Sequence, residues 1–457
     1  RGIEHDMSYV PNTAAEQQEM LHAVGASTIE DLLTPIPEAV RLKRSLDLPP
    51  ALAEPDLRRL MMGMAEQNAD LDHYISFLGA GTYDHFVPSL VPALVKRSEF
   101  LTSYTPYQPE VSQGMLQAIY EYQTMVCQLT NMDVANASLY DGSTAVVEGA
   151  LMAIGPSGRG EVIVSRALDP QYRATLQTYA HARGFTVREI GLEDGVTSVA
   201  ELEAAMTPET KAVIIQQPNF LGALEDVRGV ERVTHTGKAA FIVAITEPAS
   251  LGVLAAPGDY GADIVAAEGQ SLGNPMGYGG PALGLFAARN DYLRKLPGRL
   301  VGKTLDSRGQ DAYVLTLQTR EQQIRRERAT SNICTNQSLL AVAATIYLAA
   351  LGKEGFRELG EQCLQRAHFA QERICSLPGF EPLFTRPFFD EFAVRAPLPV
   401  EQLNAGLRDQ GISGGYDLSG DYPELGNAAL FCVTETRTRE DIEALVAAME
   451  EVAGENR

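Results

Sequence analysis

The chain has 457 residues, of which 45% are hydrophobic and 21% charged, a composition typical of a globular protein with two or three domains. Its formal net charge of −22 argues against a protein that binds nucleic acid through the phosphates. We find no apolar run of about eighteen residues and no signal-peptide core, so we expect no membrane association.

The cysteines and histidines do not have the spacing of a metal site. The five cysteines are far apart and form no CxxC pair, and the seven histidines are scattered. We therefore expect no metal, no disulfide framework, and free thiols in a reducing cytoplasm.

The first part of the chain reads as a helical N-terminal arm, residues 1–70. "TAAEQQEMLHAVG" and "EPDLRRLMMGMAEQNADL" carry apolar residues at three- and four-residue spacing, which predicts two amphipathic helices. The proline-bearing "LDLPPALAEP" separates them. We expect Met7 to be the natural start and leave the six preceding residues out of the fold.

The middle of the chain, residues 71–320, alternates between strands and helices. Helical segments such as "PQYRATLQTYAHARG" and "SVAELEAAM" separate short apolar runs, which predicts a large α/β domain with a mostly parallel sheet. The predicted strands are "EVIVS" (161–165), "FTVREI" (185–190), "KAVIIQQ" (211–217), "AFIVAIT" (240–246) and "ADIVAA" (262–267).

Ligands of such sheets bind beyond the carboxyl ends of the strands. The loops "QQPNFLG", "TEPASLG" and "AAEGQSLGNPMGYGGPALG" follow three of the predicted strands and are therefore candidate site loops. The third is rich in glycine, and its only charged residue is Glu268.

Residues 321–457 read as a small C-terminal α+β domain. A helix-rich stretch leads to "FEPLF", "DEFAVRA", the helix "PVEQLNAGLRDQG" and "NAALFCVTET". A last helix has Thr438 as its N-cap, Asp441 three residues later, and Gly454 as its stop.

A second candidate feature is the helix that follows Asp141-Gly142. Its first turn carries Ser143 and Thr144, and a helix N-terminus with small residues can bind an anion. An ordinary capped helix explains the same residues.

Tyrosines mark two loops. Tyr104 and Tyr107 lie in a proline-marked loop before Gln108, where a hydroxyl-bearing aromatic residue suits a binding wall as well as a plain connector. Tyr83 and His85 lie on the glycine loop "GAGTYDHFVP". The helical spacing of Tyr120 and Tyr122, in contrast, is consistent with packing alone.

The segment "TREQQIRRERATSNIC" has two interpretations. Arg325, Arg326 and Arg328 lie near Glu321 and Glu327, which is typical of a solvated, salt-bridged helix face. Alternatively, the arginines hold a carboxylate at a subunit or domain seam.

Long segments of the chain resemble the glycine decarboxylase P-protein family, from Met7 almost to the C-terminus and in order. They include "SEFLTSYTPYQPEVSQGMLQAIYEYQTMVCQLTNMDVANASLYDGSTA", "GADIVAAEGQSLGNPMGYGGPALG" and "RRERATSNICTNQ". More narrowly, the chain resembles subunit 1 of the split, two-subunit form. The resemblance implies fold type I of pyridoxal-phosphate-dependent transferases, the aspartate aminotransferase architecture.

In that fold a lysine after a strand forms the Schiff base with the cofactor. Laid on the family pattern, the lysine position falls near Ser271 and the preceding histidine near Gln270. Glu247 stands where an aspartate is expected against the pyridine nitrogen. We therefore expect no catalytic residue and a degenerate cofactor site made of Ser143, Thr144, Glu247, Gln270 and Ser271.

The resemblance implies a subunit of glycine dehydrogenase (decarboxylating). Its sister, P-protein subunit 2, is expected to carry pyridoxal phosphate and the lysine, to decarboxylate glycine and to pass the aminomethyl group to the lipoyl group of H-protein. A heterotetramer is implied. The residues expected to wall the sister's site in trans are Tyr83, His85, Tyr104, Tyr107, Gln108, Gln113, Tyr278, Gly279 and Gly280.

Two rival hypotheses stay open. One is an independent pyridoxal-phosphate enzyme with an unusual lysine, for which Lys303 is the mild candidate. The other is a structural or regulatory scaffold that contributes nothing to the site.

Overall fold

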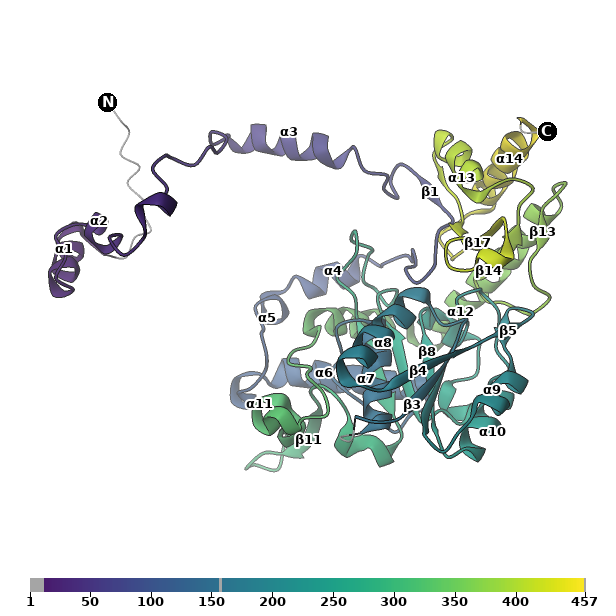
Figure 1. Cartoon of the computed structure of the whole chain (residues 1–457), viewed down its shortest axis with the longest axis horizontal. Helices are drawn as coiled ribbons and strands as arrows, with labels where there is room; N and C mark the ends of the chain where they lie inside the picture. The colour runs from purple at the N-terminus through teal and green to yellow at the C-terminus, as the bar shows by residue number, and fades with distance from the viewer. Residues whose placement is uncertain (1–11, 156–157, 456–457) are drawn as a thin grey trace. The chain divides into compact units, whose positions relative to one another are not determined.

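The structure is a computed structural model that describes residues 12–155 and 158–455 (Figure 1). Met7, expected as the natural start, lies outside them. The chain divides into two compact units, residues 1–69 and 70–457, each of which is described by itself.

From residue 12 on, the first unit consists of helices and connecting segments in which Leu21 is the one buried residue. Thr13 caps the first helix through a capping box with Glu16. The third helix buries none of its residues. Both helices predicted for the arm are therefore present; the unit contains α1 (Ala14–Ala23), α2 (Ile29–Leu32) and α3 (Glu54–Ala65).

The second unit is built on a seven-stranded sheet of order β2-β10-β9-β8-β7-β3-β4. The five strands predicted from sequence are its parallel part, and β10 runs antiparallel to β9 and β2. The strands are β2 (Val134–Ala135), β3 (Glu161–Ser165), β4 (Thr186–Ile190), β7 (Thr210–Gln216), β8 (Ala240–Ile245), β9 (Ile264–Glu268) and β10 (Gly284–Ala288).

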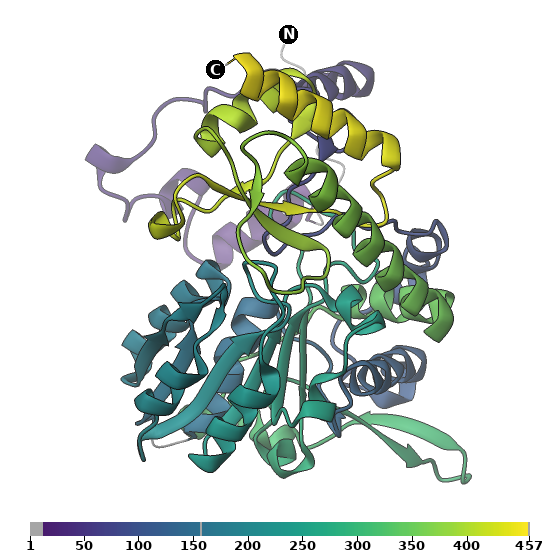
Figure 2. The ribbon, with the colours of Figure 1, turned by 90° about the vertical axis from the view of Figure 1, so that its right-hand side faces the viewer.

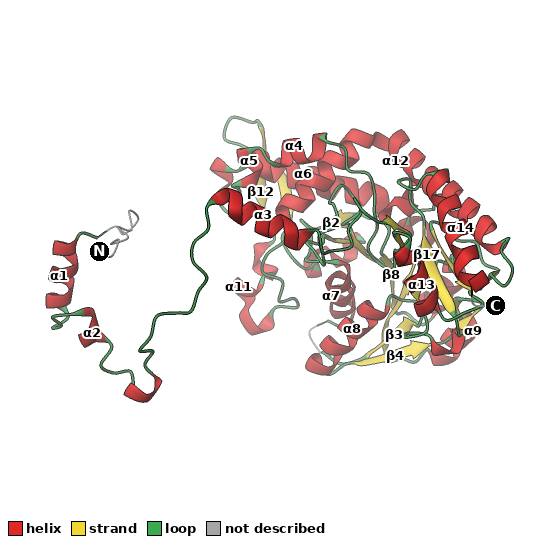
Figure 3. Ribbon diagram, turned by 90° about the horizontal axis from the view of Figure 1, so that it is seen from above, coloured by secondary structure: helices red, strands yellow, loops and turns green. Residues whose placement is uncertain are grey.

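Helices cover both faces of this sheet (Figures 2 and 3). On one face, α7 (Gly142–Ile154) and α8 (Pro170–Arg183) pack on residues such as Ile214 and Ile242. On the other face, the intervening residues, such as Ile215 and Val243, contact the remaining helices, as expected where successive side chains alternate. These are α6 (Gln113–Thr130), α9 (Val199–Ala205), α10 (Val227–Thr236) and the first half of α12 (Ser338–Cys375).

Helix α12 links the two lobes of the second unit. It is broken at Gly352, whose φ is +60°. Residues up to Cys363, on both sides of the break, pack in the core of the large sheet, and the last turns, from Ala367, pack in the core of the C-terminal lobe. Among the described residues it is the one helix whose length and composition would allow it to cross a membrane, and 44% of the apolar stretch is buried inside the protein. Burial in two cores accounts for that apolar composition.

The C-terminal lobe is a four-stranded antiparallel sheet covered by helices. An early strand, β1 (Ile75–Ser76), pairs with β15 (Ile412–Ser413) and thus ties residues 75–76 to this lobe. The last helix has the predicted Thr438 cap but continues past Gly454 to Glu455. The lobe contains β13 (Glu381–Pro382), β14 (Glu391–Arg395), α13 (Val400–Asp409), β16 (Tyr416–Asp417), β17 (Ala428–Cys432) and α14 (Arg439–Glu455).

Smaller elements complete the second unit. A hairpin projects from the region that follows β10 and carries Lys303. These elements are α4 (Leu90–Val95), α5 (Ser98–Leu101), β5 (Leu192–Glu193), β6 (Val196–Thr197), β11 (Val301–Leu305), β12 (Asp311–Leu315) and α11 (Gln322–Arg325).

Candidate functional site

The carboxyl ends of β8 and β9 bring five of the predicted residues together, although they come from distant parts of the sequence. Ser271 donates a hydrogen bond to Glu247 over 3.1 Å. Glu247 in turn lies 3.0 Å from the Nε2 atom of His85. The main chain of Tyr83 donates to the side chain of Gln270 over 3.4 Å.

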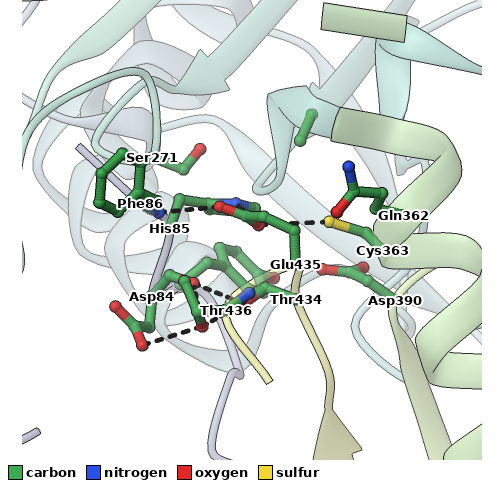
Figure 4. Close-up of polar contacts among 12 residues, drawn as sticks. Asp84, His85, Phe86, Ser271, Gln362, Cys363, Asp390, Thr434, Glu435 and Thr436 are labelled. Atoms are coloured by element: carbon green, nitrogen blue, oxygen red, sulfur yellow. Dashed lines mark hydrogen bonds and ion pairs between the residues drawn. The ribbon is translucent and has the colours of Figure 1, made fainter. Parts of the chain in front are cut away.

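His85 is enclosed by carboxylates. Its Nδ1 atom lies 2.7 Å from Glu435, opposite the contact with Glu247, and its side chain is 1% exposed. Burial opposes the positive charge, but the two carboxylates outweigh it and raise the pKa of His85 well above its usual value. His85 is therefore an imidazolium held between two glutamates; Figure 4 shows its contact with Glu435.

Cys363 lies beside this ion pair. Its thiol donates to Glu435 over 3.6 Å, so His85, Cys363 and Glu435 place three potential metal-ligand atoms within 4.8 Å of one another. Hydrogen bonds within the cluster already engage each of these atoms, and the arrangement needs no ion to account for it.

Tyr83 anchors a second buried group. Its hydroxyl donates to Glu391 over 2.9 Å and lies 3.1 Å from Thr246. Burial raises the pKa of Glu391 to about 7, although hydrogen bonds from Ala80 and Tyr83 oppose the increase. Tyr83 and His85 are thus committed to the interior of this chain.

The N-terminus of α7 already holds a carboxylate. Gly142, its first residue, donates its main-chain N–H to Glu268 over 2.9 Å, and Gln270 and Leu283 donate to the same carboxylate over 2.9 and 2.8 Å. Burial raises the pKa of Glu268, against the effect of these three hydrogen bonds. The predicted anion position is filled by the chain itself.

Ser143 and Thr144 are occupied as well. The Ser143 hydroxyl and the Thr144 main-chain N–H both donate to Asp141, over 2.7 and 2.8 Å. This turn is therefore an ordinary capped helix start, the alternative that the sequence left open. In addition, Glu268 accepts a hydrogen bond from the first N–H group of the helix.

The remaining predicted wall residues do not join this cluster. Tyr104 is 81% exposed and Tyr278 80% exposed. Gln113 fixes the hairpin strand β12 through both its amide atoms, at 2.8 and 2.9 Å from the main chain of Tyr313. Tyr107 is 54% exposed, and its hydroxyl accepts a hydrogen bond from Arg299 over 3.1 Å.

Gly279 and Gly280 have φ values of +101° and +151°. This region of backbone conformation is readily open to glycine alone, which explains the glycine turn. Gln108 is exposed in the loop that carries Tyr107.

The lysine candidates lie elsewhere. Lys303, the rival Schiff-base lysine, is on the β11–β12 hairpin and pairs with Asp311 over 2.7 Å. Within residues 12–155 and 158–455, no lysine is found in contact with Glu247 or Ser271.

The arginine segment lacks the salt-bridged face that one interpretation predicts. Within the part of the chain that the structure describes, Arg325 and Arg326 form no ion pair, and Arg328 lies only loosely, at 3.9 Å, from Glu327. The other interpretation, a carboxylate held at a seam, stays a prediction.

Sequence reasoning missed Glu435, Glu391 and Arg299, and gave Glu268 no role. The sequence could have indicated a role for Glu268, because it is the only charged residue of a glycine-rich candidate site loop. For Glu435 and Glu391 nothing in the sequence marks the partner, because each meets His85 or Tyr83 across more than 300 positions.

The fold is that of the pyridoxal-phosphate-dependent enzymes of fold type I. A sphingosine-1-phosphate lyase of Burkholderia pseudomallei superposes with a TM-score of 0.68 at 15% identity, covering 92% of this chain and 94% of that one. A cysteine desulfurase of Escherichia coli does so with a TM-score of 0.62 at 16% identity, covering 88% and 99%. At such identities the likeness concerns the fold alone.

The family follows from closer matches. The family model "Glycine cleavage system P-protein" matches residues 7–449, and the chain belongs to this family. A crystal structure of glycine decarboxylase (P-protein) in inhibitor-bound form has a TM-score of 0.88 at 44% identity, covering 98% of this chain and all of the other.

Two curated relatives have the same printed name, "Probable glycine dehydrogenase (decarboxylating) subunit 1". The protein of Moorella thermoacetica is 52% identical, over 97% of this chain and 99% of its own length. That of Brevibacillus brevis is 50% identical, over 97% and 98%.

Pyridoxal phosphate belongs to this family of folds, but the residues of this chain do not fit it. A serine hydroxyl cannot form an imine. The Glu268 carboxylate occupies the helix N-terminus that a phosphate group would need, and Glu247 is engaged by His85, Ser271 and the N–H of Ala249.

Proposed function

We propose that this chain is the lysine-free subunit of glycine dehydrogenase (decarboxylating). It assembles with a sister subunit that carries pyridoxal phosphate and the Schiff-base lysine, in a heterotetramer of the cytoplasm. The sister decarboxylates glycine and passes the aminomethyl group to the lipoyl group of H-protein.

The self-filled site is the observation that carries this proposal. Ser271 replaces the nucleophile, and Glu268 takes the place of an external anion at α7. Glu268 and Glu247 together accept five hydrogen bonds, and Glu247 also pairs with the buried His85. A site filled in this way by the chain itself favours a partner as the site of the chemistry.

What this chain offers the sister is a set of exposed side chains. Of the predicted wall residues, Tyr104, Tyr107, Gln108 and Tyr278 reach the surface, whereas Tyr83 and His85 hold the chain's own interior. We assign the wall to the exposed group, and to Tyr83, His85, Gln113, Gly279 and Gly280 the task of supporting the loops that present it.

The test compares the isolated chain with the assembled complex. The chain alone should show no glycine–CO2 exchange and no cofactor absorbance that borohydride fixes, and the complex should show both, with the cofactor on the sister. Exchange activity of the pure, partner-free chain would overturn the proposal.

A second experiment separates a wall in trans from a scaffold. Tyr104→Ala should lower turnover of the complex at least tenfold without changing its assembly. Leu305→Ala, which removes an exposed apolar side chain of β11, is the control. If Tyr104→Ala leaves turnover intact, the scaffold hypothesis is favoured.

A further inference from the structure

Arg299 is a buried cation whose described contacts are all uncharged. Only 4% of the residue is exposed. Its Nη1 atom donates to Thr335 and Asn336 over 3.4 and 3.1 Å, and its Nη2 atom donates to the Tyr107 hydroxyl over 3.1 Å. Its Nε atom has no hydrogen-bond partner among the described residues.

This arrangement differs from that of three other partly buried arginines. Arg173 and Arg437 pair with the carboxylates of Glu189 and Asp84, and Arg320 directs its guanidinium to main-chain carbonyl groups. A buried charge is costly unless a counter-charge or a full set of strong acceptors compensates it. Arg299 has neither within the part of the chain described.

The two hydroxyl groups that contact Arg299 belong to exposed residues and can each donate one more hydrogen bond. Tyr107 and Thr335 accept from the guanidinium, and a hydroxyl group that accepts still carries its own hydrogen. No acceptor for either hydrogen is present among their described contacts. Both residues are classed as exposed, so these hydrogens can reach a group outside the chain.

The N-terminus of α12 adds to the same electrostatic environment. The helix begins at Ser338, three residues after Thr335, and no side chain caps it. Its first half runs to the break at Gly352 and is long enough to present a partial positive charge at this end. A guanidinium, two hydroxyl donors and a helix N-terminus all favour a negatively charged acceptor.

We propose that Arg299, Tyr107 and Thr335 form a receptor for an oxyanion, a carboxylate or a phosphate group, presented by the active site of the sister subunit. The inference rests on the proposed function and deepens it, because it assigns a binding task to the Tyr107 loop. Two oxyanions are available there: the phosphate of the cofactor and the carboxylate of glycine.

The experiment uses the assembled complex with variants of this chain. We would measure kcat, the KM for glycine, and the apparent Kd for pyridoxal phosphate on reconstitution of the cofactor-free complex. Arg299→Met should raise one of the two binding constants on the order of 10–100-fold, since hydrogen bonds to charged groups are among the strong ones. Arg299→Lys should recover little, because lysine lacks the planar fork.

Two variants that remove a hydroxyl group are included because Arg299→Met, a substitution in the interior, could impair folding. Tyr107→Phe and Thr335→Val each remove one surface hydroxyl and should raise the same constant a few-fold. Arg408→Met, which deletes an exposed arginine of α13, is the charge-matched control and should change neither constant.

The affected constant identifies the source of the oxyanion. A raised Kd for pyridoxal phosphate, with weaker inhibition by inorganic phosphate, indicates the phosphate; a raised KM for glycine alone indicates the carboxylate. The receptor is refuted if Tyr107→Phe and Arg299→Met assemble normally and leave both constants unchanged. A wild-type complex that does not form or is inactive would instead refute the proposed function.

Discussion

At the scale of single residues, the site is defined by buried carboxylates that bind groups of the same chain. Glu268 accepts three main-chain hydrogen bonds, and Glu247 contacts both His85 and Ser271. Such groups are stable in a low-dielectric interior only because their partners are present. A single substitution at Ser271 removes its hydrogen bond to Glu247 but leaves the His85–Glu247 contact and the three hydrogen bonds of Glu268 in place.

Ser271→Lys should therefore not create an active chain. In the present structure the Ser271 hydroxyl lies 3.1 Å from Glu247. The new ammonium group should form an ion pair with this carboxylate, which would keep it protonated and unreactive. Missing support for reacting groups typically costs on the order of 10²–10³-fold per donor. Borohydride trapping of the isolated variant with pyridoxal phosphate measures the result.

Adding Glu268→Ala to Ser271→Lys frees the α7 N-terminus and is the informative comparison. The double variant should bind pyridoxal phosphate more tightly than Ser271→Lys alone. Turnover by Ser271→Lys close to that of the assembled complex would show that the site is far less altered than its hydrogen bonds indicate.

The His85 ion pair predicts how stability depends on pH. Because the pKa of His85 is raised in the folded chain, its contribution is fully present below the ordinary histidine pKa of about 6.5 and is lost as pH rises through the raised value. At pH 6, His85→Gln should lower the free energy of unfolding by about 3–5 kcal/mol, the cost of breaking a buried pair.

Denaturant unfolding between pH 6 and 10 measures this difference, which should shrink as the pH is raised. His181→Gln changes an exposed histidine of α8 and serves as the control. Curves for wild type and His85→Gln that stay parallel over this range would show that the imidazole is not held charged.

At the scale of elements, the start of α7 is packed tightly against the end of β9. A Cβ atom on Gly142 would overlap the Tyr172 hydroxyl and lie 2.9 Å from the main-chain nitrogen of Glu268. The glycine is therefore required by the close approach of helix and strand, and its N–H group is what Glu268 binds.

Gly142→Ala should lower the free energy of unfolding by about 1–3 kcal/mol, as overpacking does. Adding Tyr172→Phe should restore part of this loss, because it removes the atom that the new methyl group would meet first. Gly114→Ala, where the added Cβ meets nothing within 4 Å, should be neutral or slightly stabilising. A Gly142→Ala chain as stable as wild type would contradict the packing argument.

At the scale of the whole molecule, the first unit does not bury its own apolar residues in a core. Helix α3 has twelve residues and buries none of them, and helices of this length are marginal in water without a partner. Its exposed apolar side chains are Leu57, Leu60, Met61, Met62 and Met64. We expect the sister subunit of the proposed complex to cover this surface.

Deleting residues 7–69 should lower the Tm of the complex with the sister while leaving the Tm of the isolated chain nearly unchanged, because the central sheet lies in residues 70–457. A partner that binds only the folded state raises its Tm by mass action. Scanning calorimetry of both forms with and without the sister measures this, and equal melting of the full and truncated complexes would refute a role of the arm in assembly.

The sequence predicted much of the fold because its signals are local. The five parallel strands, the two arm helices and the Thr438 cap each follow from periodicity or from residue types within a short window. The break of α12 at Gly352 and the pairing of β1 with β15 were not predicted. The former lies inside a stretch whose composition is helical on both sides, and the latter joins residues more than 300 positions apart.

By itself, the sequence determined the family and predicts a missing lysine at Ser271, because both are matters of residue identity at given positions. Only the tertiary structure decided which groups the buried charges contact. Glu268 reaches α7, Glu435 reaches His85, and Arg299 reaches Tyr107 across long sequence separations. Whether a buried charge is compensated depends on atoms within a few ångströms of it, and those neighbours exist only once the sheet and its two lobes have formed.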